Sequence, residues 1–273
     1  MASQSGVFRF IKESLSDVID GFEAIQGSKT LQFSTLLAKL IAEVAKSDEA
    51  RHKLSEAETV PLVVELHMRA IIHLRQSTAI HYLDDLAIQT TRCIANLCYD
   101  NEWNREIIAD IPSAVEMIVM GLTTKNSELL KTVTGALVNF SMDNDNIQQL
   151  LLESNAMELL LSILRGIKPE AHSDPHMESV FQSSIRAFSN IIETARGADE
   201  LLAHRGLLTV FELLKIMHDV SVRPNITIEE YSRALQLLEG LVIVLDTIVE
   251  HGGLEERFLL FDPAILTFSF IFI

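Results

Sequence analysis

The chain has 273 residues, of which 48% are apolar and only 6% aromatic, and it carries a formal net charge of −16. This apolar content excludes a disordered chain, and six prolines and eleven glycines are too few for a fold rich in hairpins. The acidic balance argues against binding to nucleic-acid phosphates, which needs clustered Lys and Arg. It favours a basic partner, or serves solubility alone.

The first 30 residues predict an N-terminal helical cap. The segment SLSDVIDGFEAI, residues 14–25, has apolar residues at helical spacing, and QGSK after it interrupts the pattern. We expect armadillo repeats over residues 31–257, as about four to five units. An atypical apolar tail follows at residues 258–273.

An apolar helix, a polar break and a short amphipathic segment recur four times. The copies are KLIAEVAKSDEARHKL at 39–54, RCIANLCYDNEWNREI at 92–107, GALVNFSMDNDNIQQL at 135–150 and RAFSNIIETARGADEL at 186–201. One position of this alignment, here called the marked position, holds Glu43, Asn96, Asn139 and Asn190. The spacing of 43 residues between Asn96 and Asn139 falls in the ~40–47 residues of armadillo and HEAT repeats.

Each copy continues through a second turn into a second apolar helix. Pro112, Asn155 and Gly206 lie sixteen residues after the three asparagines and are typical of turns or helix starts. A unit therefore contains a short, a middle and a long helix, which is the armadillo pattern. We expect an all-α fold, an armadillo-repeat right-handed superhelical solenoid whose stacked units share one core. A further, degenerate unit is expected around residues 231–253.

The marked position predicts a partner-binding groove. In an armadillo solenoid the third helix lines the concave surface, where a row of amides can donate to and accept from an extended peptide backbone. Carboxylates near the ends of these helices oppose the helix dipole, and a basic ligand is one way to compensate them. The candidate groove residues are Glu43, Asn96, Asp100, Asn139, Asp143, Asn190 and Glu193.

Structural roles are open alternatives for the same residues. Each asparagine can instead hydrogen-bond a neighbouring helix end. Asp100 and Asp143 are expected to cap the short helices that follow them, with the adjacent Asn101 and Asn144 as alternative caps. Trp103, the single tryptophan, is expected to pack in the core or in an interface.

The sequence contains none of the motifs G-x-S-x-G, G-x-x-x-x-G-K or H-E-x-x-H. We therefore expect no enzyme, no cofactor and no metal site. His67, His73 and His81 follow no ligand pattern and are expected on the surface or in loops. Cys93 and Cys98 lie five residues apart on one helix, a spacing that suits neither a disulfide nor a zinc site.

The tail FLLFDPAILTFSFIFI, residues 258–273, holds five of the thirteen phenylalanines. It is too short to span a membrane. We expect the end of a truncated reading frame, with a cap on the last repeat or insertion into a partner as alternatives. The two cysteines and the absence of a signal peptide predict a cytoplasmic protein of the cytosol.

Three segments resemble repeats of the small G-protein dissociation stimulator family. They are LIAEVAKSDEAR at 40–51, TTRCIANLCYDNEWNREII at 90–108 and TGALVNFSMDNDNIQQLL at 134–151. The resemblance covers roughly residues 35–215. It implies an all-armadillo cytosolic protein that binds small GTPases of Rho and Ras type with a polybasic, often prenylated C-terminus. It also implies guanine-nucleotide exchange and chaperoning of these GTPases.

An alternative reading is a generic armadillo scaffold for protein–protein interaction, without nucleotide-exchange activity. A third reading, an importin-like carrier of basic signals, is less favoured because such grooves pair several asparagines with tryptophans and this chain has one Trp. Family members are about twice as long as this chain, which leaves exchange activity the least secure of the implied properties.

Overall fold

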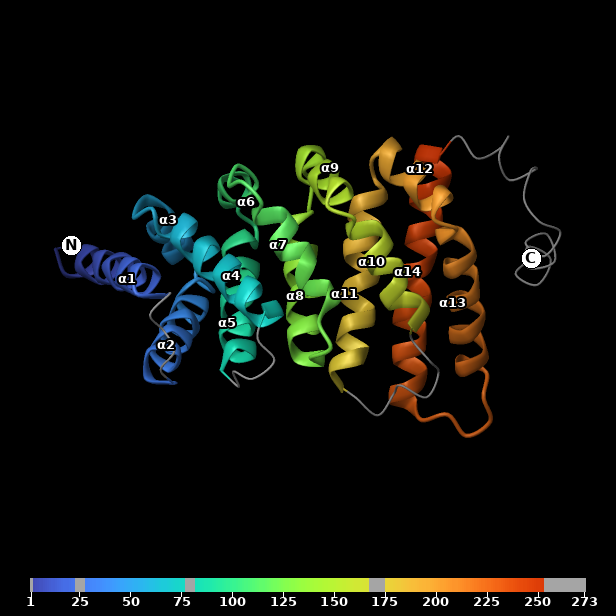
Figure 1. Cartoon of the computed structure of the whole chain (residues 1–273). Coiled ribbons are helices and arrows are strands. Elements are labelled where there is room, and N and C mark those ends of the chain that lie inside the picture. Colours follow the sequence, from blue (N-terminus) through green and yellow to red (C-terminus); the bar gives the residue numbers. More distant parts are fainter. Residues whose placement is uncertain (1, 23–27, 77–81, 167–174, 253–273) are drawn as a thin grey trace. The chain divides into compact units, whose positions relative to one another are not determined.

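The computed structural model describes residues 2–22, 28–76, 82–166 and 175–252, and these residues form helices joined by turns, without a strand (Figure 1). The chain divides into two compact units, Met1–Met142 and Asp143–Ile273, which are taken in turn below. The apolar tail expected at residues 258–273 lies outside the described residues. Within the described part, none of the helices combines the length and the hydropathy of a membrane span.

The first unit repeats a short, a middle and a long helix, as the sequence predicts. After α1 (Ala2–Asp20) and the long helix α2 (Ser28–Val44), two sets of helices follow. They are α3 (Asp48–Glu56), α4 (Thr59–Gln76), α5 (Leu83–Cys98), α6 (Glu102–Ala109), α7 (Ala114–Met120) with its 3-10 turn η2 (Gly121–Thr123), and α8 (Ser127–Phe140). The long helices α2, α5 and α8 lie side by side (Figure 1).

The second unit continues the same order of helices. It contains α9 (Asp145–Glu153), α10 (Ala156–Gly166), α11 (Pro175–Ile192), α12 (Ala195–Ala203), α13 (Gly206–Ser221) and α14 (Ile228–Gly252). The degenerate unit expected near residues 231–253 is the long helix α14, which packs on α11 and α13.

Left-handed backbone marks the turn between each short helix and the following middle helix. Glu58, Ser113, Asn155 and Arg205 have φ values of 55°, 63°, 66° and 56°. Such values are uncommon for residues other than Gly, Asn and Asp, and they end one helix abruptly before the next begins. The turn predicted from Pro112, Asn155 and Gly206 is thereby confirmed in each repeat, since α13 starts at Gly206 itself.

Apolar faces of the long helices supply the core of the first unit. In α5, Leu86, Ile94 and Leu97 are fully buried between the helices on either side. Cys93 is also buried, and its thiol donates to the carbonyl of Ala38 in α2 at 2.9 Å. Both cysteines are free thiols. Burial raises the pKa of Cys98 to about 12 and raises that of Cys93 further, so both stay protonated and act as small apolar groups.

His67 is fully buried, so the expectation that it lies on the surface was wrong. It sits in α4, and its Nδ1 lies 3.2 Å from the hydroxyl of Thr90 in α5. Because the Thr90 hydroxyl already donates to the carbonyl of Leu86 at 2.9 Å, it must accept from His67, which fixes the proton on Nδ1. Nε2 is buried with no hydrogen-bond partner among the described residues. Burial therefore lowers the pKa of His67 to about 4 from its usual 6.5.

This histidine predicts a loss of stability in mild acid. Between pH 6.5 and 4 the unfolded chain binds a proton at His67 that the folded chain refuses, so the free energy of unfolding falls as the pH falls. The expected loss from this group is about 3 kcal/mol. Urea unfolding of the wild type and of His67→Gln, which keeps a donor toward Thr90 without titrating, measures it as the difference between the two pH slopes.

His52→Gln provides the matched control, because His52 is exposed. It should keep the wild-type slope between pH 6.5 and 4. Equal slopes for the wild type and His67→Gln would contradict the assignment of a neutral buried imidazole.

Candidate functional site

The marked positions of the first unit form a row on successive long helices. The amide Nδ2 of Asn96 donates to the carbonyl of Ala42 at 2.7 Å, and that of Asn139 donates to the carbonyl of Ala95 at 2.9 Å. Each acceptor is the residue just before the marked position of the preceding long helix. Glu43, Asn96 and Asn139 are therefore neighbours in the order that the repeats predict, and the row joins α2 to α5 and α5 to α8.

These hydrogen bonds have a structural purpose. Both acceptor carbonyls lie in the last turn of their helices, where the carbonyl groups lack an N–H partner within the helix. The amides of the next repeat supply that partner, which is the alternative role left open by the sequence. Both asparagines remain half-buried, and within the described residues their Oδ1 atoms accept no hydrogen bond. The amide oxygens can still accept from a ligand, while one of the two N–H groups on each Nδ2 is used by the neighbouring helix.

Glu43 is exposed but is not an open carboxylate. Lys46 donates to it at 2.6 Å, and Arg92 of α5 lies 3.2 Å from its other oxygen. The hydrogen bond from Lys46, helped by the charges of Lys46 and Arg92, holds the pKa of Glu43 below its usual value. The side chains of the protein itself therefore compensate this carboxylate, where the sequence suggested a basic ligand.

Asp100 and Asp143 do not cap the short helices, so this expectation was wrong for both. Each has a φ of 47° and occupies the left-handed position just before the cap. The side chain of Asn101 accepts from the backbone N–H of Asn104 in α6, and in the second unit that of Asn144 accepts from the N–H of Ile147 in α9. Asn101 and Asn144 fill the cap position because a cap residue needs extended backbone. The left-handed turn falls one residue earlier, at Asp100 and Asp143. Both aspartates keep exposed side chains that a ligand can reach.

Asn190 and Glu193 belong to the second unit, with Asn190 half-buried in α11 and Glu193 exposed just beyond its end. The amide of Gln148 in α9 donates to Glu193 at 3.4 Å. Thr194, the next residue, caps α12 by accepting from the N–H of Gly197 at 3.1 Å. The end of α11 thus repeats the arrangement found after Asn96, with an exposed acid beside a capped short helix.

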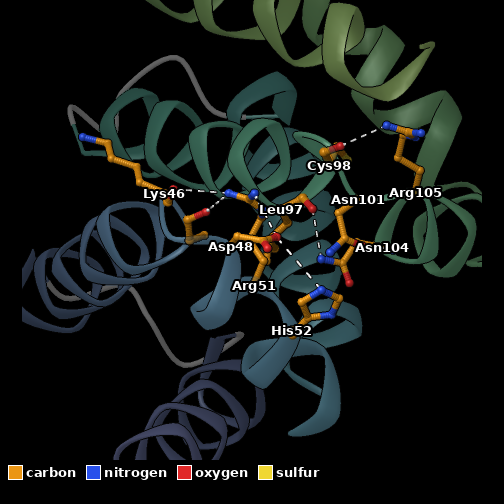
Figure 2. A network of polar contacts seen from close by, with 10 residues as sticks. Lys46, Asp48, Arg51, His52, Leu97, Cys98, Asn101, Asn104 and Arg105 are labelled. Atoms are coloured by element: carbon orange, nitrogen blue, oxygen red, sulfur yellow. Dashed lines mark hydrogen bonds and ion pairs between the residues drawn. The ribbon is translucent and has the colours of Figure 1, made fainter. Parts of the chain in front are cut away.

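Buried arginines form a feature that the sequence analysis missed (Figure 2). Arg51 of α3 is 4% exposed and donates to the carbonyls of Ala45 and Lys46, just beyond the end of α2, at 3.2 Å each. Its guanidinium also lies 5.6 Å from the ring centre of Tyr99. A cation at this point donates to the free carbonyl groups at the end of the helix, and the negative end of the helix dipole stabilises its charge.

The next repeat uses the same device. Arg105 of α6 donates to the carbonyl of Cys98 at 3.3 Å, and Asn104 beside it donates to that of Leu97 at 2.9 Å (Figure 2). Arg51 and Arg105 each come four residues after the N-cap of their short helix, Ser47 and Asn101. A comparison of residues at a fixed distance from the caps would have revealed this position in the sequence.

Trp103 is 64% exposed, so the expectation that it packs in the core was wrong, and packing in an interface with a partner stays a prediction. The inner face of α6 is taken by Asn104, Arg105 and Ile108, which turns Trp103 outward. We use the name aromatic corner for this exposed surface at the end of α5 and the start of α6. It consists of Tyr99, Asp100, Glu102, Trp103 and Glu106.

The aromatic corner presents two aromatic rings and three carboxylates to solvent. Such a surface can stack on a cation through its rings and pair with it through its carboxylates. Within the described residues no three His, Cys, Asp or Glu side chains are grouped so that they could hold a metal ion. Its exposed rings and carboxylates are groups that suit contact with a cationic side chain of another molecule.

Comparison with solved structures identifies the class of fold. The designed armadillo repeat protein YIII(Dq)4CqI superposes with a TM-score of 0.59 at 15% identity, over 88% of this chain and 99% of that one. The all-α armadillo fold predicted from the sequence is thereby confirmed.

Residues 11–255 match the family model described as the BEM4 N-terminal domain, so the chain belongs to the BEM4-like N-terminal domain family. Rap1 GTPase-GDP dissociation stimulator 1-B and 1-A of Xenopus laevis are 26% and 28% identical to it over 256 residues. Each match covers 89% of this chain and 39% of the relative, so the chain spans about two-fifths of their length. The resemblance to dissociation stimulators found in the sequence is confirmed.

The row of amides predicts a stability effect separable from binding. Asn96→Asp keeps the shape of the side chain but replaces the donor by an acceptor that faces the carbonyl of Ala42. We expect the free energy of unfolding to fall by about 1–3 kcal/mol, measured by urea unfolding. Asn146→Asp makes the same exchange at an exposed position of α9 and should change stability by less than about 0.5 kcal/mol. A stable Asn96→Asp protein would show that the amide donor is dispensable.

Proposed function

We propose that this chain regulates small GTPases and binds them through their basic C-terminal tails. The observation that carries the proposal is the similarity to two GTPase-GDP dissociation stimulators over 89% of the chain. Rho- and Ras-type GTPases with a polybasic, in part prenylated, C-terminus are the partners we propose, and the cytosol is the proposed site of action. We keep residues 1–30 as a proposed cap and residues 31–257 as the proposed repeats.

The charge of the chain supports a basic partner. A net charge of −16 attracts a Lys- and Arg-rich tail over a distance and speeds the encounter. Salt should weaken this attraction because mobile ions screen exposed charges over about 8 Å at physiological ionic strength.

The aromatic corner is the part of the first unit best suited to hold such a tail. Trp103 is exposed, whereas Tyr99 already has the guanidinium of Arg51 over its ring. Among the described residues, no lysine or arginine pairs with the three carboxylates as Lys46 and Arg92 pair with Glu43. An arginine of the tail can stack on Trp103 while its charge pairs with Asp100 or Glu102. In the first unit, the Oδ1 atoms of Asn96 and Asn139 remain proposed contacts for a partner. In the second unit, taken by itself, Asp143, Asn190 and Glu193 remain proposed contacts.

Exchange by such a protein needs no bond-making residue. A regulator that binds the nucleotide-free GTPase more tightly than the loaded form shifts the equilibrium toward nucleotide release. Chaperoning follows from the same preference, because a bound GTPase is withheld from other contacts. The scaffold alternative shares the binding step and lacks this difference in affinity.

Binding of GTPases with and without their basic tails, at low and high salt, tests the proposal. We expect micromolar binding that is lost when the tail is deleted or the salt is raised. A nucleotide-release assay on the same panel separates an exchange factor from a scaffold. The proposal fails if no tailed GTPase of the panel binds at micromolar protein, or if binding is indifferent to both tail and salt.

Two variants locate the site. Asp100→Asn keeps a residue that tolerates left-handed backbone and removes one charge, so binding should weaken about two- to fivefold at low salt. Trp103→Ala should weaken it about tenfold or more if the ring is an anchor. Glu116→Gln removes one exposed charge from α7, outside the aromatic corner, and should leave affinity unchanged. If Glu116→Gln and Asp100→Asn weaken the affinity equally, the tail does not bind at the aromatic corner.

A further inference from the structure

The first long helix, α2, carries an exposed apolar row on the side that points away from the following repeat. Its carbonyls at Ala38 and Ala42 accept from α5, which defines the side facing that repeat. At about 100° of rotation per residue, Phe33, Leu36 and Leu40 lie on the opposite side. They are 48–64% exposed, which is unusual for three neighbouring large apolar side chains.

The equivalent positions of the later repeats show what this row is built for. In α2 the marked position is Glu43; Phe33 lies ten residues before it and Leu40 lies three residues before it. The corresponding residues of α5 and α8 are Leu86, Cys93, Leu129 and Ala136, and all four are fully buried. In α5 this side packs against the preceding long helix, α2. The row on α2 is therefore a stacking surface of the same kind, which α1, packed on α2 and α4, leaves exposed.

The last long helix of the described part, α14, carries the opposite surface. Arg233 pairs with Glu178 of α11 at 3.2 Å, and a Cβ on Gly240 would lie 3.1 Å from Ile185, so these positions face α11. Tyr231, Leu235 and Val242 lie on the side opposite to them and are 43–56% exposed. Long helices of the first unit bury this outward side against the next long helix, as α2 does against α5.

Charge distinguishes the two surfaces. Lys29 and Lys39 are exposed on α2 beside its apolar row, where the exposed Glu43 is paired with Lys46 and Arg92, while Glu239 and Asp246 are exposed on α14 beside the other row. The two apolar rows therefore carry charges of opposite sign. An isologous pair of α14 surfaces would bring like charges together, whereas α14 against α2 brings opposite charges together.

We infer that copies of this chain associate head to tail, with the α14 surface of one copy stacked on the α2 surface of a second. The contact continues between molecules the stacking of long helices that α2, α5 and α8 show within the first unit. Because the two surfaces differ, the contact is heterologous, and copies joined by it form either a closed ring or an open chain.

Sedimentation equilibrium of the full chain over a range of concentrations tests this inference. We expect the average mass of the wild type to rise above that of the monomer and to reach at least that of a dimer at high micromolar protein. Leu40→Asp and Leu235→Asp each place a charge in one row, and each alone should weaken association at least about tenfold. Mixed together, the two variants should form a one-to-one dimer and no larger species, because each supplies the surface that the other lacks.

Leu208→Asp changes an exposed leucine of α13 outside both rows and should associate like the wild type. Circular dichroism and thermal unfolding of each variant confirm that it is folded, and the mixing result requires folded partners. A wild type that stays monomeric at every concentration would overturn the inference, as would variants that associate normally. A mixture in which both variants remain monomeric would exclude head-to-tail stacking. If the wild type is monomeric and Leu235→Asp lowers the thermal stability, then the chain itself covers the α14 surface, and the inference is overturned.

Discussion

The structure depends on how the carbonyl groups at the ends of its long helices are satisfied. A helix leaves its last carbonyls without partners, and the ends of α2 and α5 are buried enough that these groups need donors from elsewhere. The donors are side chains of the protein: Asn96 and Asn139 from the next long helix, and Arg51 and Arg105 from the short helix. Within the first unit, each repeat is thereby fixed to the preceding long helix by directional bonds as well as by apolar packing, which sets the distance and the register between these repeats.

The same asparagines explain what could and could not be predicted from the sequence. Their spacing, with the turn residues sixteen positions later, was sufficient to predict three helices per repeat and the order of the elements. It could not decide what each amide binds, because a repeated Asn is equally suited to a ligand and to a helix end. That choice depends on the distance between neighbouring helices, which periodicity does not contain.

Other misjudged residues have local causes. Asp100 and Asn101 are both good caps by residue type, and only the backbone angle decides that Asn101 fills the role. Trp103 was expected in the core or in an interface because tryptophan usually packs there, yet Arg105 takes the inner face of the helix to reach the carbonyl of Cys98, which also accepts from the backbone N–H of Asn101. His67 was expected outside because it follows no ligand pattern, although its place on α4 is an apolar one that Thr90 makes tolerable.

Cys93 gives the molecule a natural reporter of motion between repeats. Its thiol is enclosed where α5 meets α2 and is bonded to a carbonyl of α2. A reagent can reach this sulfur only while the two helices are apart, and the raised pKa keeps it unreactive until then. The rate at which Cys93 is alkylated in the native protein therefore reports how often that seam opens, without any engineered label. A partner that bridges α2 and α5 would keep the two helices together and slow the alkylation of Cys93.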